Sequence, residues 1–134
     1  MNERYSFRGK YSGKIRDFVG KFVYGDLISI FGMSYIHPQN NATEVNDYDL
    51  TKLLALHPID AVTIGQCTGL RDKRGRLIFE GDIVITSKGG NRVLVAWNAE
   101  KLCFEGTRDS VLYYVKPGCE VIGNIHDNPE LLEQ

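Results

Sequence analysis

Hydrophobic and polar residues alternate over short stretches along most of the chain, a pattern that is typical of β-strands. The clearest case is 92–98, where Val93, Val95 and Trp97 fall on one face of the predicted strand. Similar runs recur at spacings of roughly 8–12 residues, which favours an all-β barrel or sandwich. We predict strands at 4–10, 21–24, 27–31, 33–36, 62–66, 77–79, 82–86, 92–98, 102–105, 110–115 and 119–125.

Turn-forming residues separate these strands. Gly25-Asp26 is expected to end one strand. The turn-forming residues at 37–41 are expected to interrupt the regular secondary structure. Further along, 72–75 indicates a turn and Gly81 a kink. The run 87–91 predicts a hairpin turn because two glycines lie between two apolar segments.

Helical signals are few. In 49–56, Leu50, Leu53 and Leu54 recur at helical spacing, and Pro58 is expected to end this short helix. Near the C-terminus, Asn128 followed by Pro129 predicts a helix start, with one turn of helix over 130–133.

Composition indicates a soluble globular domain, since the 134 residues are 43% apolar and 25% charged. The net charge is 16 − 17 = −1, which argues against a histone-like basic protein and an acidic disordered tail. No stretch of 18 apolar residues exists, and the N-terminus lacks the layout of a signal peptide. We therefore expect a cytoplasmic protein with no membrane partner.

The cysteine and histidine residues show no metal-ligand spacing. The three cysteines are far apart and form no C-x-x-C pair, so we expect reduced, mostly buried thiols at Cys67, Cys103 and Cys119. The three histidines likewise match no known ligand pattern. We expect no metal site and no cofactor.

Charge is distributed unevenly. Residues 1–21 carry +4 and residues 120–134 carry −4, so opposite ends of opposite sign favour a homo-oligomer. Four cations and Asp72 give 71–76 a charge of 4 − 1 = +3. Such a loop can contact phosphates, which predicts salt-dependent nucleic-acid binding. The candidate nucleic-acid-binding residues are Arg71, Lys73, Arg74 and Arg76, with Arg8 and Lys10 from the basic N-terminal segment.

A second interpretation of this loop stays open, because charged runs are common on solvated turns that only keep a protein soluble. A catalytic interpretation has less support. Glu80 and Asp82 lie two residues apart and could share Mg²⁺ on one strand face, but Gly81 between them indicates a turn. No catalytic residue is assigned, and we expect the protein not to be an enzyme.

Longer motifs suggest a family. The segment 66–84 reads QCTGLRDKRGRLIFEGDIV, and 121–131 reads VIGNIHDNPEL. Together with FRGK at 7–10, FVYGDL at 22–27 and IDAVTIGQ at 59–66, they resemble the YopX-like family of phage- and prophage-encoded proteins. Cys67 stands where that family usually has Tyr or Phe, and Phe22 where Trp is common. The resemblance implies a small SH3-like β-barrel in the C-terminal part, and a fold rather than a reaction.

The predicted fold is therefore mainly β. It comprises an N-terminal β-rich segment with a short helix (1–60) and a YopX-like C-terminal β-barrel (61–134). We expect a phage or prophage accessory protein in the cytoplasm of a bacterial host, acting as a non-enzymatic binding module for nucleic acid. The alternative is a protein–protein adaptor for a host or phage protein, or a homo-oligomer subunit, with no nucleic-acid role. A metal-dependent hydrolase is the least supported class.

Overall fold

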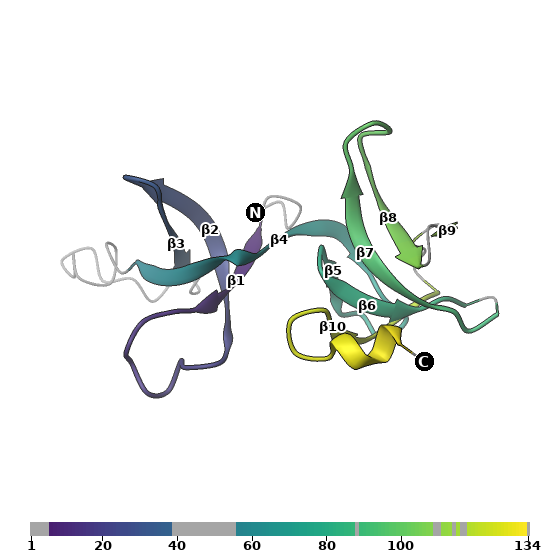
Figure 1. The fold of residues 1–134 in the computed structure, drawn as a ribbon, viewed down its shortest axis with the longest axis horizontal. Helices are drawn as coiled ribbons and strands as arrows, with labels where there is room; N and C mark the ends of the chain where they lie inside the picture. Colours follow the sequence, from purple (N-terminus) through teal and green to yellow (C-terminus); the bar gives the residue numbers. More distant parts are fainter. Residues whose placement is uncertain are drawn as a thin grey trace. The chain divides into compact units, whose positions relative to one another are not determined.

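The computed structural model describes residues 6–38, 56–87, 89–108, 111–113, 115 and 118–133, and these residues are mainly β (Figure 1). Their only helical element is a short 3₁₀ helix, η3 (Pro129–Leu132). The strands are β1 (Phe7–Tyr11), β2 (Phe22–Ile30), β3 (Met33–Pro38), β4 (His57–Arg71), β5 (Leu77–Phe79), β6 (Asp82–Ile85), β7 (Arg92–Asn98), β8 (Cys103–Arg108), β9 (Val111–Tyr113) and β10 (Glu120–Asn124).

The chain divides into two compact units, Met1–Gln66 and Cys67–Gln134. Strand β4 runs through this division, so its first part belongs to unit 1 and its end to unit 2. The boundary predicted from the sequence, at 60/61, falls inside the same strand.

Unit 1 is a closed ring of strand pairs. Strand β1 pairs antiparallel with both β2 and β4, and β3 also pairs with both β2 and β4. Among the described residues of this unit, the buried apolar side chains are Tyr11, Ile36 and Ile59. Where the β1–β4 register shifts, Thr63 Oγ1 accepts a hydrogen bond from Lys10 N at 2.7 Å, which satisfies a backbone donor at the irregularity.

The segment between β1 and β2 is held by an aromatic cluster. The Phe18 ring lies 5.5 Å from the Tyr11 ring and 5.0 Å from the His57 ring. Burial, aided by the nearby charge of His37, lowers the pKa of His57, which favours the neutral ring in this apolar setting.

Unit 2 contains an antiparallel sheet of order β10-β6-β7-β8-β9, and β5 pairs with the end of β4. Its core cluster consists of Ile78, Val84, Val93, Val95 and Cys119, with Phe104, Val115 and Val121 packed against it. The alternation predicted for 92–98 is confirmed, since Val93 and Val95 are buried. Trp97 lies at the end of that face, where it is half exposed and stacks edge-on against Phe104.

One strand prediction in unit 1 was wrong. Strand β2 continues through Gly25, which was expected to end a strand, because Gly25 pairs with Phe7 on one side and Pro38 on the other. Pairing with the neighbouring strands overrides the local turn preference there. Pro58, which was expected to end a helix over 49–56, lies near the start of β4 opposite Tyr35.

The helix predictions have different outcomes. The predicted helix at 49–56 lies outside the described residues except for Leu56, which is not helical. At the C-terminus a turn of 3₁₀ helix forms over Pro129–Leu132, but the Asn128 side chain does not cap it. Asn128 Oδ1 instead accepts a hydrogen bond from Asn124 N, at 3.3 Å.

The thiol prediction is confirmed. Cys67 and Cys119 are buried, Cys103 is half-buried, and all three are free. Within the described part of the chain, no helix is both long and apolar enough to cross a lipid bilayer.

Gly9 lies close to the Ile59 side chain, and we expect this contact to make Gly9→Ala destabilising. A Cβ at Gly9 would lie 2.5 Å from Ile59 Cδ1. Overpacking of this kind typically lowers the free energy of unfolding by about 1–3 kcal/mol. Chemical denaturation measures the loss.

The matched control is the double variant Gly9→Ala/Ile59→Val, which lacks the clashing Cδ1. Its loss of stability should be smaller than the sum of the two single losses. Simple additivity would show that this contact does not limit the packing.

Candidate functional site

The basic loop, defined as Arg71 to Arg76, is a tight turn between β4 and β5. Asp72 N donates a hydrogen bond to the carbonyl of Arg76 (2.8 Å), and Gly75 N donates to the carbonyl of Asp72 (2.9 Å). Gly75 has a φ of 81°, in the left-handed region that favours glycine. The predicted turn at 72–75 is confirmed.

The Asp72 carboxylate is buried and accepts four hydrogen bonds. Oδ1 accepts from the backbone N–H groups of Arg74 and Arg76, both at 2.9 Å. Oδ2 accepts from Val121 N at 3.0 Å and from Arg76 Nε at 3.2 Å. One side chain therefore closes the loop and also joins it to strand β10.

These bonds decide the protonation state of Asp72. Burial raises the pKa of this carboxyl group, but hydrogen bonds from the backbone of Val121, Arg76 and Arg74 lower it, as does the Arg76 charge. The net effect places the pKa below its ordinary value, so the group is ionised at neutral pH.

Glu120, at the start of β10, pairs with two cations of the basic loop. Lys73 Nζ lies 3.0 Å from Glu120 Oε2, and Arg74 Nε lies 3.2 Å from Oε1. The hydrogen bond from Lys73 is the largest influence on Glu120 and lowers its pKa. The Lys73 and Arg74 side chains stay 56% and 67% exposed, so solvent still reaches both.

The other two cations of the loop contact the backbone. Arg71 Nη1 donates to the carbonyl of Gly75 (2.7 Å), and Arg76 Nη2 donates to the carbonyl of Val121 (2.6 Å). Arg76 thus contributes to folding as well as to charge. Adding Glu120 to the loop charge of +3 leaves +3 − 1 = +2.

Arg8 and Lys10 lie in unit 1, on strand β1, and share one aromatic partner. Arg8 Cζ lies 4.4 Å from the centroid of the Phe22 ring, and Lys10 Nζ lies 4.5 Å from it. Lys10 Nζ also donates to the carbonyl of Gly20 at 2.8 Å. Arg8 is buried, and its guanidinium makes a cation–π contact with Phe22.

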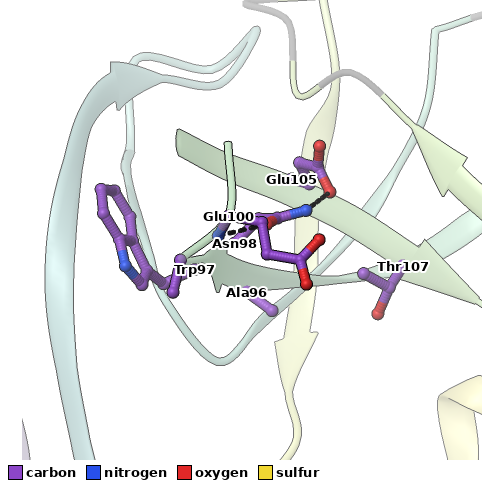
Figure 2. A pocket seen from close by; sticks show the side chains of 7 residues that line it. Ala96, Trp97, Asn98, Glu100, Glu105 and Thr107 are labelled. Atoms are coloured by element: carbon purple, nitrogen blue, oxygen red, sulfur yellow. Dashed lines mark hydrogen bonds between the residues drawn. The ribbon is translucent and has the colours of Figure 1, made fainter. Parts of the chain in front are cut away.

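A further hollow of about 330 Å³ lies on the β7–β8 hairpin and is lined by Ala96, Trp97, Asn98, Ala99, Glu100, Glu105 and Thr107 (Figure 2). Buried Glu105 accepts hydrogen bonds from Asn98 Nδ2 (2.9 Å) and pairs with Lys101 Nζ (3.1 Å). The Asn98 bond lowers the pKa of Glu105 the most, and Lys101 adds to the effect. Glu105 is therefore an ionised group that these partners already satisfy.

Comparison with known proteins decides the family, because a family model described as YopX protein matches residues 21–133. The chain belongs to the YopX family. The fold is similar to the crystal structure of protein EF1440 from Enterococcus faecalis, at 24% identity and a TM-score of 0.49 over 95% of this chain and 96% of that chain. No curated protein matches the chain.

The YopX match confirms the resemblance found in the sequence and has a consequence for the candidate residues. Its range includes the basic loop, Asp72 and Glu120. Arg8 and Lys10 precede it. The YopX segment therefore contains the whole ion-pair arrangement of unit 2.

Sequence reasoning found the loop cations but missed the partners that orient them. Glu120 and Val121 are far from the loop in sequence, and β10 brings them to it through hydrogen bonds such as Lys73 N to the Cys119 carbonyl, at 2.9 Å. The one available signal was charge, since the −4 C-terminal segment begins at Glu120.

The carboxylate pair considered for Mg²⁺ is arranged as a turn. Gly81 has a φ of 93°, and buried Asp82 accepts a hydrogen bond from Phe79 N at 2.8 Å through Oδ2. In the part of the chain that the structure describes, no three His, Cys, Asp or Glu side chains gather as a metal-binding group.

Asp72→Asn tests the buried carboxylate. An amide nitrogen in place of Oδ2 would face the N–H of Val121 and Nε of Arg76, two donors that need an acceptor. We expect the free energy of unfolding at pH 7 to fall by about 2–3 kcal/mol. Urea denaturation of both proteins measures this difference.

The difference should depend on pH in one direction. Because the folded-state pKa of Asp72 lies below its ordinary value, its contribution is complete above about pH 5 and decreases as the pH falls below about 4. Asp17→Asn, at an exposed position, is the charge-matched control and should change stability by less than about 0.5 kcal/mol. A pH-independent difference would contradict the assigned role.

Proposed function

We propose that the chain is a non-enzymatic binding module that contacts the phosphate backbone of nucleic acid through Arg71, Lys73, Arg74 and Arg76. The observation that carries this proposal is the convergence of Lys73 and Arg74 on one carboxylate, at 3.0 and 3.2 Å, on an exposed surface. Two cations that bond both oxygens of one carboxylate can also donate charge-assisted hydrogen bonds to two oxygens of a phosphate group.

The rigidity of the loop supports the same proposal. Four hydrogen bonds to Asp72 hold the backbone of the turn, so the positions from which Lys73 and Arg74 project are fixed before a ligand binds. Such contacts carry little sequence information, and we therefore propose sequence-tolerant, salt-dependent binding. The Glu120 carboxylate then competes with the phosphate for Lys73 and Arg74.

Arg8 and Lys10 have a smaller part in this proposal. Both interact with Phe22, and Arg8 is buried, so neither is placed as a principal phosphate contact. We propose that Lys10, which is half-buried, adds general positive charge at most.

The finer architecture of unit 2 is also a proposal. The antiparallel order β10-β6-β7-β8-β9 around one apolar cluster supports the SH3-like β-barrel that the family resemblance implies. Membership of the YopX family supports a phage or prophage origin and a role in the bacterial cytoplasm. Small β-rich domains of this kind often bind ligands with loops placed on a rigid scaffold.

Replacing Glu120 by Gln tests the proposed competition. The change releases Lys73 and Arg74 from their ion pairs, so affinity for a labelled DNA oligonucleotide should rise about threefold at low salt. Glu133→Gln, at an exposed position, is the control with the same change in charge and should have a smaller effect. Fluorescence anisotropy with single- and double-stranded DNA measures both.

Charge reversal tests the loop directly. Arg74→Glu should abolish binding, whereas Arg16→Glu, in an exposed part of unit 1, should weaken it only slightly. Arg76 is a poor choice for reversal because it also bonds Asp72 and Val121. For about two to three phosphate contacts, log affinity should fall against log salt with a slope of about −2 to −3.

The same titrations separate the alternative class. A protein–protein adaptor for a host or phage protein, or a homo-oligomer subunit, with no nucleic-acid role predicts no salt-dependent binding to either oligonucleotide. That result, together with an unchanged Arg74→Glu variant, would remove the phosphate proposal.

A further inference from the structure

The β2–β3 hairpin ends in an apolar tip, defined as Ile30, Phe31, Gly32 and Met33. Ile30 is 41% exposed, Met33 is 58% exposed, and the Phe31 side chain is wholly exposed. Single exposed apolar residues are common, but three adjacent large ones form a patch of the kind that marks contact sites.

The backbone of the tip adds a second observation. Phe31 and Gly32 both have positive φ, 49° and 78°, which is the geometry of a type I′ turn. Asn-Gly suits that turn, whereas a bulky residue in the left-handed region is disfavoured. Since Phe31 is wholly exposed, packing within the chain does not offset this cost.

The apolar surface continues from the tip along one face of the hairpin. In the strand register, Ile30 faces Met33 and Ile28 faces Tyr35. Residues two apart on a strand share a face, so these four side chains lie together. The Tyr35 hydroxyl, 3.7 Å from Met33 Sδ, agrees with this arrangement.

The hairpin extends beyond the ring of paired strands. Among the residues that the structure describes, β1 pairs with β2 only as far as Gly25, and β4 pairs with β3 only at Tyr35 and Ile36. Residues 27–34 therefore form a two-stranded arm, which Figure 1 shows as the end of the β2–β3 hairpin. Such an arm presents its outer backbone edges for further strand pairing.

The absence of charge on the arm favours an apolar, neutral partner. No residue from Leu27 to Ile36 is charged. Nucleic acid and anionic lipid are both recognised through Lys and Arg, so a neutral arm is unsuited to either. A second copy of the same arm is apolar and neutral, and two copies can meet without like-charge repulsion in a two-fold contact that uses the same patch twice.

We propose that this arm, through its tip and the Ile28–Tyr35 face, forms a homodimer contact between two copies of the chain. Because only a few side chains take part, we expect the contact to bury less than the roughly 800 Å² per partner of a standard interface and the dimer to be weak and concentration-dependent. The contact lies in unit 1 and does not depend on the phosphate proposal for unit 2.

Phe31→Asn tests the contact, with sedimentation equilibrium of the full chain from about 10 µM to about 1 mM as the measurement. The wild type should show a concentration-dependent dimer, and the variant should raise the dimer Kd at least about tenfold. Since Asn-Gly suits a type I′ turn, the variant should melt no lower than the wild type, which excludes unfolding as the cause.

Leu102→Asn is the matched control. Leu102 also has a positive φ, 55°, and is 73% exposed, but Glu100 and Lys101 precede it in the turn between β7 and β8. This variant likewise replaces a large exposed apolar side chain by Asn in a similar backbone conformation, and it should dimerise as the wild type does. Met33→Thr, a second variant within the tip, should weaken the dimer as Phe31→Asn does.

Three results would overturn the proposal. These are a wild type that stays monomeric at every concentration, a Phe31→Asn variant that dimerises normally, and a Leu102→Asn variant that weakens the dimer equally. A monomeric wild type that co-sediments with phosphatidylcholine vesicles would instead assign the tip to a lipid surface. An apolar contact should also persist at raised salt, so a dimer that dissociates there would count against it.

Discussion

The buried carboxylate of Asp72 is the constraint on which the organisation of unit 2 around the basic loop depends. A buried charge is tolerated only where hydrogen bonds replace the water that it loses. Two backbone donors come from its own turn and one from Val121, so the turn and β10 must meet. That meeting also puts Glu120 beside Lys73 and Arg74. The positions of the exposed Lys73 and Arg74 side chains beside Glu120 therefore follow from the hydrogen bonds that the buried Asp72 carboxylate needs.

Much of the fold was predictable because strands with one buried face leave a clear alternation in the sequence. Arg92–Asn98 and Leu77–Phe79 were located correctly for this reason. The prediction at Gly25 failed because Gly25 carries a local turn signal, whereas its conformation is set by pairing with β1 and β3. The helix cap predicted at Asn128 was wrong for a different reason, because the Asn128 side chain accepts a hydrogen bond from Asn124 N instead.

The candidate site was only half predictable, because a run of cations is visible in sequence and the acceptors that orient it are not. In the sequence Arg76 looked equivalent to Arg74. In the structure Arg76 donates hydrogen bonds to Asp72 and Val121, whereas Arg74 pairs with Glu120 at the surface. Arg8 looked like an exposed cation and proved to be buried over Phe22. Periodicity alone gave no warning of the apolar tip, since Phe31 simply continues an apolar run.

The closed ring of unit 1 has a consequence for synthesis of the protein. Phe7 pairs with both Gly25 and Gln66, and the second partner is 66 − 7 = 59 residues later in the chain. At about 5–20 residues per second, a ribosome needs about 3–12 s to add those residues. Until Ile59, the first β4 partner of β1, has been made, β1 can pair only with β2, and one of its edges stays open on the nascent chain. A translational pause before Gln66 would lengthen the time during which that edge is available to other strands.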